Sequence, residues 1–246
     1  MPTDQYIRFY AIDKAGNVES VNSFDISSRT VCGAYGSYTL ANDVIYRSDQ
    51  SQCFDISSLL DCDGHTIAYD GPALAGSSAI KLSGSAVIEN CNIVGFDGAI
   101  DLFNNDNVQI LNNTIDACGW RGCGRNGITR SAEPGINNIS IIGNDFIGQE
   151  GAAIDVPNAS NSIIKDNRLS NILGTGIKVF TGNDFSIANN TVNLTLYNRA
   201  HGFWVSKIND LEFNNNVVEG GCYYSCVSID SSTDVNMLNN QLLSLI

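Results

Sequence analysis

The stretch "GIKVFTGNDFSIANNTV", residues 176–192, contains the pattern that decides the fold. Apolar and polar residues alternate, a turn follows at Gly182 to Asp184, and a second alternating run begins at Phe185. Alternation with period two is typical of a half-buried β-strand, and Gly, Asn and Asp favour turns. Two asparagines, Asn189 and Asn190, then stand where a core-facing strand would continue. The stretch predicts two short strands and a polar bend.

This pattern recurs along the chain. Full copies are "AIDLFNNDNVQILNNTI" (99–115), "AIDVPNASNSIIKDNRL" (153–169), "GFWVSKINDLEFNNNVV" (202–218) and "CVSIDSSTDVNMLNNQL" (226–242). "GITRSAEPGINNISIIGNDFI" (127–147) has a longer turn and "AIKLSGSAVIENCNI" (79–93) a shorter one. The anchoring residues of the copies are Asn113, Asn144, Asn167, Asn190, Asn216 and Asn240, with Cys91 in the same slot of the first copy.

The anchoring asparagines are separated by 31, 23, 23, 26 and 24 residues. A repeat of this length indicates a solenoid, and the period-two alternation indicates coils of strands instead of helices. We therefore predict an all-β fold, a right-handed parallel β-helix of about seven to eight coils.

The repeated asparagine has a structural explanation. Equivalent residues of neighbouring coils lie above one another at about 4.8 Å. A buried amide without a partner costs about 1–3 kcal/mol, whereas stacked amides donate to and accept from each other along the column. The anchoring residues therefore predict an internal asparagine ladder.

Composition and charge exclude several functions. The chain has 30 asparagines and 23 glycines, 43% of its residues are hydrophobic, and its net charge is −13. Such a charge repels nucleic acid phosphate and anionic membranes. The sequence has neither an apolar run of 18 residues nor the order of a signal peptide, so no direct membrane insertion is expected.

Cysteines indicate an oxidising compartment. They form close or repeat-spaced pairs, namely Cys32 and Cys53, Cys62 and Cys91, Cys118 and Cys123, and Cys222 and Cys226. We expect disulfides; zinc is the alternative for the last two pairs. For Cys62 and Cys91 a bridge across coils and a stacked pair of buried thiols both stay open. Sequons at five positions fit an exported protein: Asn112, Asn138, Asn158, Asn189 and Asn193.

"LLDCDGHTIAYDG" followed by "AIKLSGSAVIENCNIVGF" resembles the opening coils of right-handed parallel β-helix proteins of the pectate-lyase-like superfamily, especially its secreted or periplasmic repeat proteins. The resemblance covers residues 53–246 and implies the fold. It leaves the activity open, because the superfamily contains lyases, hydrolases, adhesins and tailspikes.

Residues 1–28 are expected to form a separate piece. "YIRFYAIDKAGNVESVNSFDI" (6–26) predicts a hairpin with a turn at Gly16-Asn17, and it resembles the last two strands of immunoglobulin-like or fibronectin-like surface modules. Residues 29–60 would cap the solenoid and lead into it, and residues 61–246 would form the coils. Because the seventh copy is still in register at Ile246, we expect a fragment truncated at its C-terminus.

Aligned copies place one outward residue at the centre of each first strand: Lys81, Asp101, Thr129, Asp155, Lys178, Trp204 and Ser228. A column of small residues two positions earlier predicts a shallow groove beside this polar stripe. Trp204, expected to be exposed, would offer a stacking surface for a sugar ring. The predicted ligand-binding residues are Asp155, Lys178, Trp204, His201 and Phe180. The alternative is that they are ordinary surface residues, with Asp155 and Lys178 forming a solvated ion pair.

Catalysis is the rival interpretation of the stripe. The catalytic candidates are Asp101, Asp155 and Lys178, with Arg130 as a further nearby cation. A glycoside hydrolase needs two carboxylates about 5–9.5 Å apart, and a lyase would need calcium and a cationic base. No transition-metal motif is present, so we expect neither a metal nor a cofactor.

These features predict an extracellular, cell-surface or periplasmic β-helix module that recognises polysaccharide or another surface partner. A polysaccharide lyase or hydrolase acting on the same face, and a structural spacer or adhesin scaffold, are the alternatives. The sequence does not determine the oligomeric state.

Overall fold

The computed structural model describes residues 32–46, 52–70, 77–116, 126–130, 135–195 and 201–243, and the backbone of 6–9, 22–25, 118–119 and 122–123. The chain divides into two units, Met1–Val31 and Cys32–Ile246. In the first unit β1 (Tyr6–Phe9) pairs antiparallel with β2 (Asn22–Asp25). The predicted turn at Gly16-Asn17 lies outside the described residues, so the immunoglobulin-like assignment stays a prediction.

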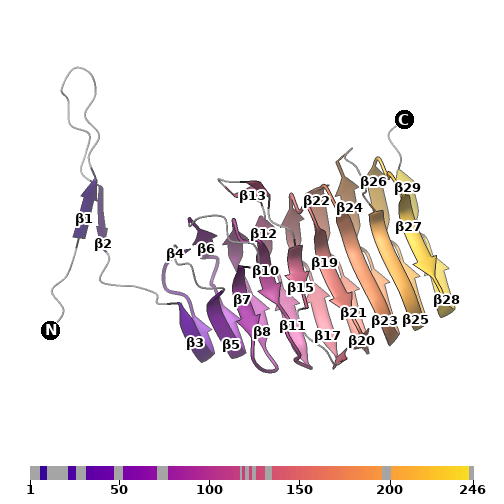
Figure 1. Cartoon of the computed structure of the whole chain (residues 1–246), viewed down its shortest axis with the longest axis horizontal. Helices are drawn as coiled ribbons and strands as arrows, with labels where there is room; N and C mark the ends of the chain where they lie inside the picture. The colour runs from indigo at the N-terminus through magenta and orange to yellow at the C-terminus, as the bar shows by residue number, and fades with distance from the viewer. Residues whose placement is uncertain are drawn as a thin grey trace, which may run out of the picture. The chain divides into compact units, whose positions relative to one another are not determined.

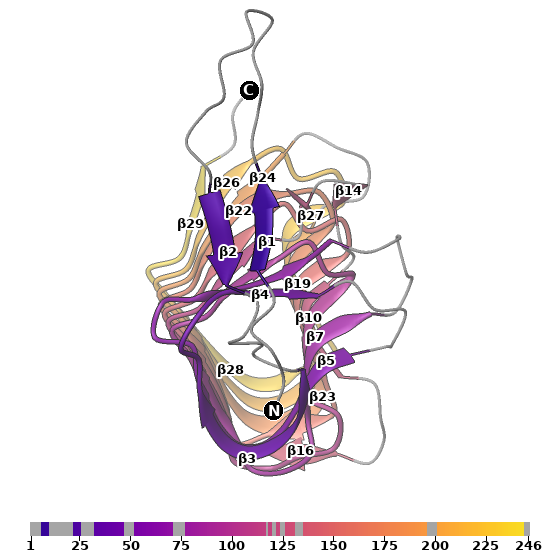
Figure 2. The same ribbon diagram turned by 90° about the vertical axis from the view of Figure 1, so that its left-hand side faces the viewer.

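The second unit is a parallel β-solenoid of about eight turns (Figure 1). Its described residues form strands and no helix. Each strand pairs in parallel with its equivalents one coil away. In Figure 2 the coils lie behind one another and surround a common interior. The all-β solenoid predicted from the repeat is confirmed.

One sheet of 14 strands bends around two sides of the solenoid. It contains β3 (Gly33–Thr39), β5 (Gln52–Asp61), β7 (Ser78–Leu82), β8 (Val87–Glu89), β10 (Gly98–Asp101), β11 (Val108–Leu111), β15 (Asn126–Thr129), β17 (Ile139–Ile142), β19 (Ala152–Pro157), β21 (Ser162–Lys165), β23 (Thr175–Ala188), β25 (His201–Asn214), β27 (Ser225–Asp230) and β28 (Thr233–Leu238). The long strand β25 follows the bend and pairs with both β27 and β28.

A second sheet of 9 strands closes each coil. It contains β4 (Val44–Tyr46), β6 (Thr66–Tyr69), β9 (Asn92–Val94), β12 (Thr114–Asp116), β18 (Asp145–Ile147), β22 (Arg168–Ile172), β24 (Thr191–Leu194), β26 (Val217–Gly220) and β29 (Gln241–Leu243). Two short pairs lie outside these sheets, β13 (Cys118–Gly119) with β14 (Gly122–Cys123) and β16 (Ile136–Asn137) with β20 (Ala159–Ser160).

The core consists of in-register columns of apolar side chains. One column contains Phe54, Ile80, Ile100, Ile128, Ile154, Ile177 and Phe203, each 0% exposed. Burying one such side chain contributes about 1.5–3 kcal/mol. Because the register repeats every coil, the alternation read from the sequence fixes which side chains face inward.

The asparagine ladder is present in the interior. Asn190 shows its geometry: its Oδ1 accepts hydrogen bonds from Asn167 N at 3.1 Å and from Asn167 Nδ2 at 3.0 Å. Its own Nδ2 donates to Asn216 Oδ1 at 3.1 Å and to Ile164 O at 2.9 Å. The same bonds recur from Asn113 to Asn240. Each ladder amide therefore accepts hydrogen bonds from the backbone and side-chain donors at the bend of the preceding coil.

The residue before each ladder position explains why asparagines come in pairs. This residue has positive φ in every coil, for example 54° at Asn112, 56° at Asn189 and 70° at Gly143. Asn, Asp and Gly adopt this left-handed conformation most easily. The first residue of each pair therefore forms the bend, and the side-chain amide of the second hydrogen-bonds the polar groups at the bends. The sequence did not reveal this division of roles.

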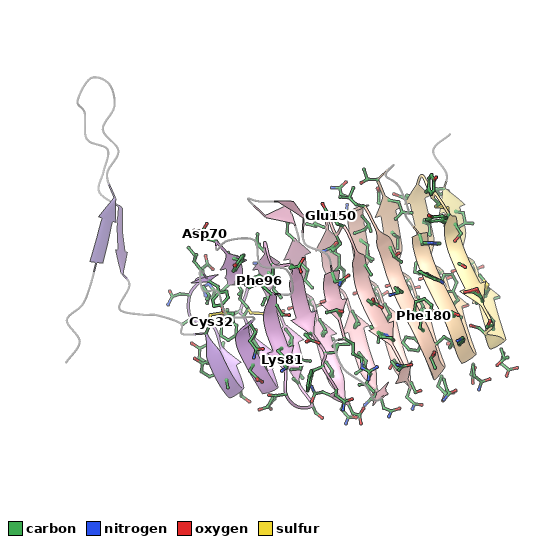
Figure 3. All side chains as sticks on the ribbon, viewed as in Figure 1. Cys32, Asp70, Lys81, Phe96, Glu150 and Phe180 are labelled. Atoms are coloured by element: carbon green, nitrogen blue, oxygen red, sulfur yellow. A yellow bond between two sulfur atoms is a disulfide. The ribbon has the colours of Figure 1, made fainter. Side chains whose placement is uncertain are left out.

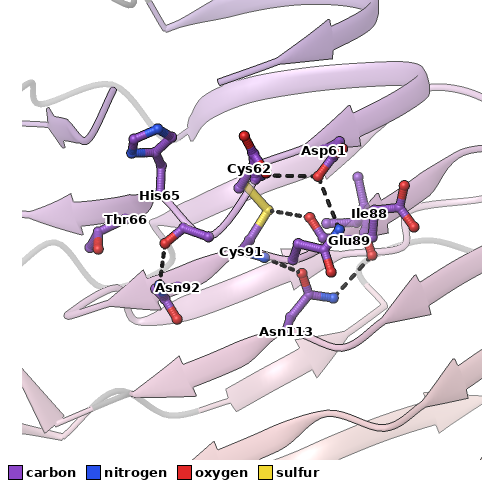
Figure 4. Close-up of a disulfide and its surroundings, with 12 residues drawn as sticks. Asp61, Cys62, His65, Thr66, Ile88, Glu89, Cys91, Asn92 and Asn113 are labelled. Carbon is purple, nitrogen blue, oxygen red and sulfur yellow. Dashed lines mark hydrogen bonds between the residues drawn. A yellow bond between two sulfur atoms is a disulfide. The ribbon is translucent and has the colours of Figure 1, made fainter. Parts of the chain in front are cut away.

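A disulfide replaces the ladder at its N-terminal end (Figure 4). Cys91 occupies the ladder slot, and its backbone N donates to Asn113 Oδ1 at 2.9 Å. Its sulfur is bonded to Cys62 one coil earlier. A covalent bond thus links the two coils where an amide pair would otherwise do so, which decides between the bridge and the stacked thiols.

The other cysteines follow the expected pairs where their side chains are described. Cys32 is joined to Cys53 and Cys222 to Cys226 by disulfides. The zinc alternative is therefore wrong for the latter pair. Cys118 and Cys123 face each other across β13 and β14, but their side chains lie outside the described residues.

The last described coil has an uncovered interior. Val235 is 36%, Met237 47% and Leu242 57% exposed, although their equivalents one coil earlier are buried. No further strand of the described residues pairs with the outer edge of this coil.

Candidate functional site

The predicted polar stripe exists as one column on the outer face of the 14-stranded sheet. Strand registers align Lys81 with Asp101, Asp101 with Thr129, Asp155 with Lys178, Lys178 with Trp204, and Trp204 with Ser228. Asp55 extends it by one coil, because it is in register with Lys81. The sequence analysis missed Asp55, since its coil lacks the repeated asparagine anchor that permitted alignment.

An ion pair lies at the centre of the stripe. Lys178 Nζ is 2.9 Å from Asp155 Oδ2, and the side chains are 30% and 19% exposed. The other carboxylate oxygen, Asp155 Oδ1, is buried and has no hydrogen-bond partner among the described residues. The pair neutralises the lysine and leaves one acceptor of Asp155 unused.

Aromatic rings gather beside this pair. Phe180, which is labelled in Figure 3, packs edge-on against Trp204 with ring centroids 4.8 Å apart. Its ring lies 5.2 Å from Lys178 Nζ. His201 stacks on Trp204 at 5.2 Å. All five predicted ligand-binding residues therefore lie in one cluster on β19, β23 and β25. Their role in binding stays a prediction.

Two further rings extend this cluster. Tyr224 stacks on His201 with ring centroids 5.2 Å apart and an interplanar angle of 15°, and Tyr223 packs edge-on against Tyr224 at 5.0 Å. Both lie between Cys222 and Cys226. The sequence signal was the motif "CYYSC" one coil after His201, which the sequence analysis treated only as a cysteine pair. We call Phe180, His201, Trp204, Tyr223 and Tyr224 the aromatic cluster.

The environment of His201 favours its neutral form. Burial lowers the pKa of His201 from 6.5, because desolvation penalises the charged imidazolium. Its Nδ1 lies 2.9 Å from Ser225 Oγ, which is in register on the next coil. His201 is therefore uncharged at pH 7.

Trp204 differs from the expectation of an exposed ring. It is only half-exposed, because Phe180 and His201 pack against it. The most exposed rings of the cluster are instead Tyr223 and Tyr224. Alternation predicted the outward direction correctly but not the coverage by neighbours.

The predicted groove of small residues is wrong. Ala99 and Ala153 are 3% and 0% exposed. A Cβ on Gly176 would lie 2.7 Å from Val192 Cγ1, and one on Gly202 would lie 2.8 Å from Val218 Cγ1. The column is small because Val192 and Val218 of the opposite sheet leave no room for a larger side chain at its glycines.

The catalytic candidates are only partly available. Asp101 is 8% exposed, and its Oδ1 accepts a hydrogen bond from Phe103 N at 2.9 Å, which caps the turn after β10. One coil separates Asp101 from Asp155, so their backbones are about 10 Å apart, beyond the carboxylate spacing of a retaining enzyme. Arg130 is also 8% exposed, and its Nη1 donates to Pro157 O at 2.9 Å.

Within the described part of the chain, no group of three or more His, Cys, Asp or Glu side chains is arranged to hold a metal ion. The same part of the chain contains no helix long and apolar enough to cross a membrane.

The stacked coils and their inward columns define a right-handed parallel β-helix. The family described as "Right handed beta helix region" matches residues 79–242, more than half of the chain, and the protein belongs to this family. A comparison with curated protein sequences found no significant match.

A solved structure shows the same fold. DFA-IIIase from Arthrobacter chlorophenolicus A6 without its lid is 14% identical, with a TM-score of 0.51; the alignment covers 85% of this chain and 65% of that one. PfbA, a surface adhesin of Streptococcus pneumoniae, is 13% identical, with a TM-score of 0.45 and coverage of 86% and 83%. The periplasmic alginate epimerase AlgG is 13% identical, with a TM-score of 0.41 and coverage of 85% and 68%. At these identities the likeness concerns the fold alone.

Proposed function

We propose that this protein is an extracellular or cell-surface β-helix module that recognises polysaccharide along the stripe. The observation that carries the proposal is the aromatic cluster beside the Asp155–Lys178 pair. Aromatic rings offer apolar faces to the C–H groups of sugars, and nearby polar groups bond the hydroxyls. The disulfides support an oxidising compartment, as in secreted and periplasmic proteins.

The net charge of −13 supports a partner other than nucleic acid or an anionic membrane, because both carry the same sign of charge. The aromatic cluster supports binding in preference to a purely structural role. A spacer needs only a solvated surface, whereas exposed apolar groups that gather at one place commonly mark an interaction site.

The proposal is tested by measuring binding of the whole chain to a panel of neutral and acidic polysaccharides. Trp204→Ala removes the central ring and should abolish retention while leaving the fold intact. Ile163→Ala is the matched control, because Ile163 is 40% exposed on β21, outside the stripe. Retention by wild type and by Trp204→Ala alike, or by neither, would contradict the proposal.

The partly exposed carboxylate–lysine pair of Asp155 and Lys178 favours a second candidate, a polysaccharide lyase or hydrolase at the same place. Incubation of the same panel with and without calcium, followed by analysis of shorter products, separates it from binding alone. Product release that is lost in Asp155→Asn or Lys178→Ala would establish catalysis. Binding without products would establish a recognition module.

A further inference from the structure

The aromatic cluster is most open to solvent at its tyrosines. Tyr223 is 64% and Tyr224 58% exposed, more than any other described aromatic side chain. Other exposed apolar residues lie singly, as Ile45 and Ile163 do, or on the last coil. The two tyrosines are therefore the part of the cluster that a ligand in solution meets first.

The inner rings of the cluster are largely occupied by one another. Trp204, His201 and Tyr224 form a stack in which His201 lies 5.2 Å from each of its two neighbours. A ring whose faces are covered cannot stack on a sugar. The apolar surface left for a ligand is thus provided mainly by Tyr223 and Tyr224, with the inner rings supporting them from below.

Two attachments hold the tyrosines in place. The Cys222–Cys226 disulfide closes a loop with a sequence separation of 4, and Tyr223 and Tyr224 lie within it. Ser225, the next residue, is 2.9 Å from His201 through its Oγ. A loop fixed before binding loses less conformational entropy when a ligand arrives, which raises affinity.

The charges around the cluster disfavour an anionic ligand. On β19, β23, β25 and β27 the cations are Lys178, which Asp155 neutralises at 2.9 Å, and Lys207, which is exposed within β25 where φ is positive. Asp230 is exposed on β27, two residues after the stripe position Ser228. Within the described residues, the stripe beside the rings therefore offers hydroxyl partners and acidic groups but no unpaired cation.

We infer that the ligand is a neutral glycan, and that it stacks on the Tyr223–Tyr224 pair, which the Cys222–Cys226 disulfide holds in position. This inference rests on the proposed function and specifies both the chemical class of the glycan and the residues that contact it. A uronate would meet Asp230, and among the described residues of the stripe no unpaired cation would compensate its charge. A neutral chain meets the exposed tyrosine rings, whose faces contact sugar C–H groups and whose hydroxyls bond sugar hydroxyls.

Isothermal titration of the whole chain with cellohexaose, mannohexaose and xylohexaose, and with a galacturonate oligomer of equal length, tests the inference. At least one neutral oligomer should bind, with the same Kd at low and high salt because no net charge is involved. Tyr224→Ala should weaken this binding by about tenfold, equivalent to about 1.4 kcal/mol. Tyr224→Phe keeps the ring and should bind within about twofold of wild type.

Two further variants locate the effect. Cys222→Ser with Cys226→Ser leaves both tyrosines but frees the loop, and should weaken binding by several fold. Phe103→Ala is the matched control, since Phe103 is 38% exposed beside Lys81, at the other end of the stripe. It should leave the Kd unchanged. Far-ultraviolet circular dichroism of each variant establishes that the strands are intact.

If the galacturonate oligomer binds more tightly than the neutral oligomers and its Kd depends on salt, the inference is overturned. If Trp204→Ala also abolishes that binding, the proposed function still stands. Binding lost in Trp204→Ala but unaffected by Tyr224→Ala would also overturn it. If no glycan binds the wild type, the proposed function fails together with the inference.

Discussion

The ladder and the stripe are both columns of residues in register, yet their compositions differ. Inside, nearly every coil supplies asparagine, because a buried amide is satisfied by an identical amide above and below it. Outside, the stripe changes from Lys178 to Trp204 to Ser228, because a side chain that reaches water needs no identical neighbour to satisfy its polar groups. The interior therefore constrains residue identity, whereas the surface leaves it free for a ligand to exploit.

The largest expected effect is on the ladder. Asn190→Leu removes the acceptor of Asn167 N and Nδ2, and leaves both donors buried. We expect the free energy of unfolding to fall by about 4 kcal/mol, from two buried donors without partners. Urea denaturation measures it. The control Asn189→Gly changes the exposed neighbour, whose φ of 56° suits glycine, and should cost less than about 1 kcal/mol. Equal midpoints for wild type and Asn190→Leu would refute the ladder.

The disulfide end of the same column sharpens the comparison. Cys62→Ala with Cys91→Ala opens a loop with a sequence separation of 29 and should cost about 3–4 kcal/mol on the chain-entropy estimate. Cys62→Ala with Cys91→Asn should recover about 1 kcal/mol, because the new amide can donate to Asn113 Oδ1. Denaturation of the two double variants tests this. No difference between them would show that the slot does not accept an amide.

The column of small residues should not tolerate larger side chains, although it was predicted to face solvent. Gly176→Ala places a Cβ 2.5 Å from Gly202 O and 2.7 Å from Val192 Cγ1. We expect a loss of about 1–3 kcal/mol in unfolding free energy from overpacking. Gly36→Ala is the control, because nothing lies within 4 Å of its Cβ. If the Gly176→Ala variant is as stable as the Gly36→Ala variant, the column does not face the interior.

The smallest effect concerns His201. Its folded pKa lies below 6.5, so the unfolded chain binds more protons in the interval between the two values. This contribution to stability is present above pH 6.5 and is lost as pH falls through that interval. Thermal unfolding from about pH 5 to 8 should show a shallower decline for His201→Gln than for wild type. A steeper decline would contradict the assigned direction.

The fold was predictable because its signal repeats. The alternation around Ile177 and the slot of Asn190 recur at each coil, so strand positions, inward residues and ladder followed from one alignment. The position of Asn189 in the left-handed bend also lay in that repeat, although its meaning required the φ angle.

The candidate site was only partly predictable. Register brought Asp155, Lys178 and Trp204 together as expected. Tyr223 and Tyr224 could not be placed, because they lie in a loop between repeats whose position depends on a disulfide and on a contact with His201. The small residues were assigned to the wrong side, because the strict alternation breaks there: Gly176 and its neighbour Ile177 are both buried in β23.

The sequence by itself determined the solenoid, its register and its ladder, since these depend on local alternation and on one residue type repeated at one spacing. Only the tertiary structure decided which outward side chains are covered, which cysteines are joined, and that five rings meet on neighbouring coils. The physical reason is that a repeat specifies how each coil pairs with the next one, whereas coverage and ring contacts depend on side chains that differ from coil to coil.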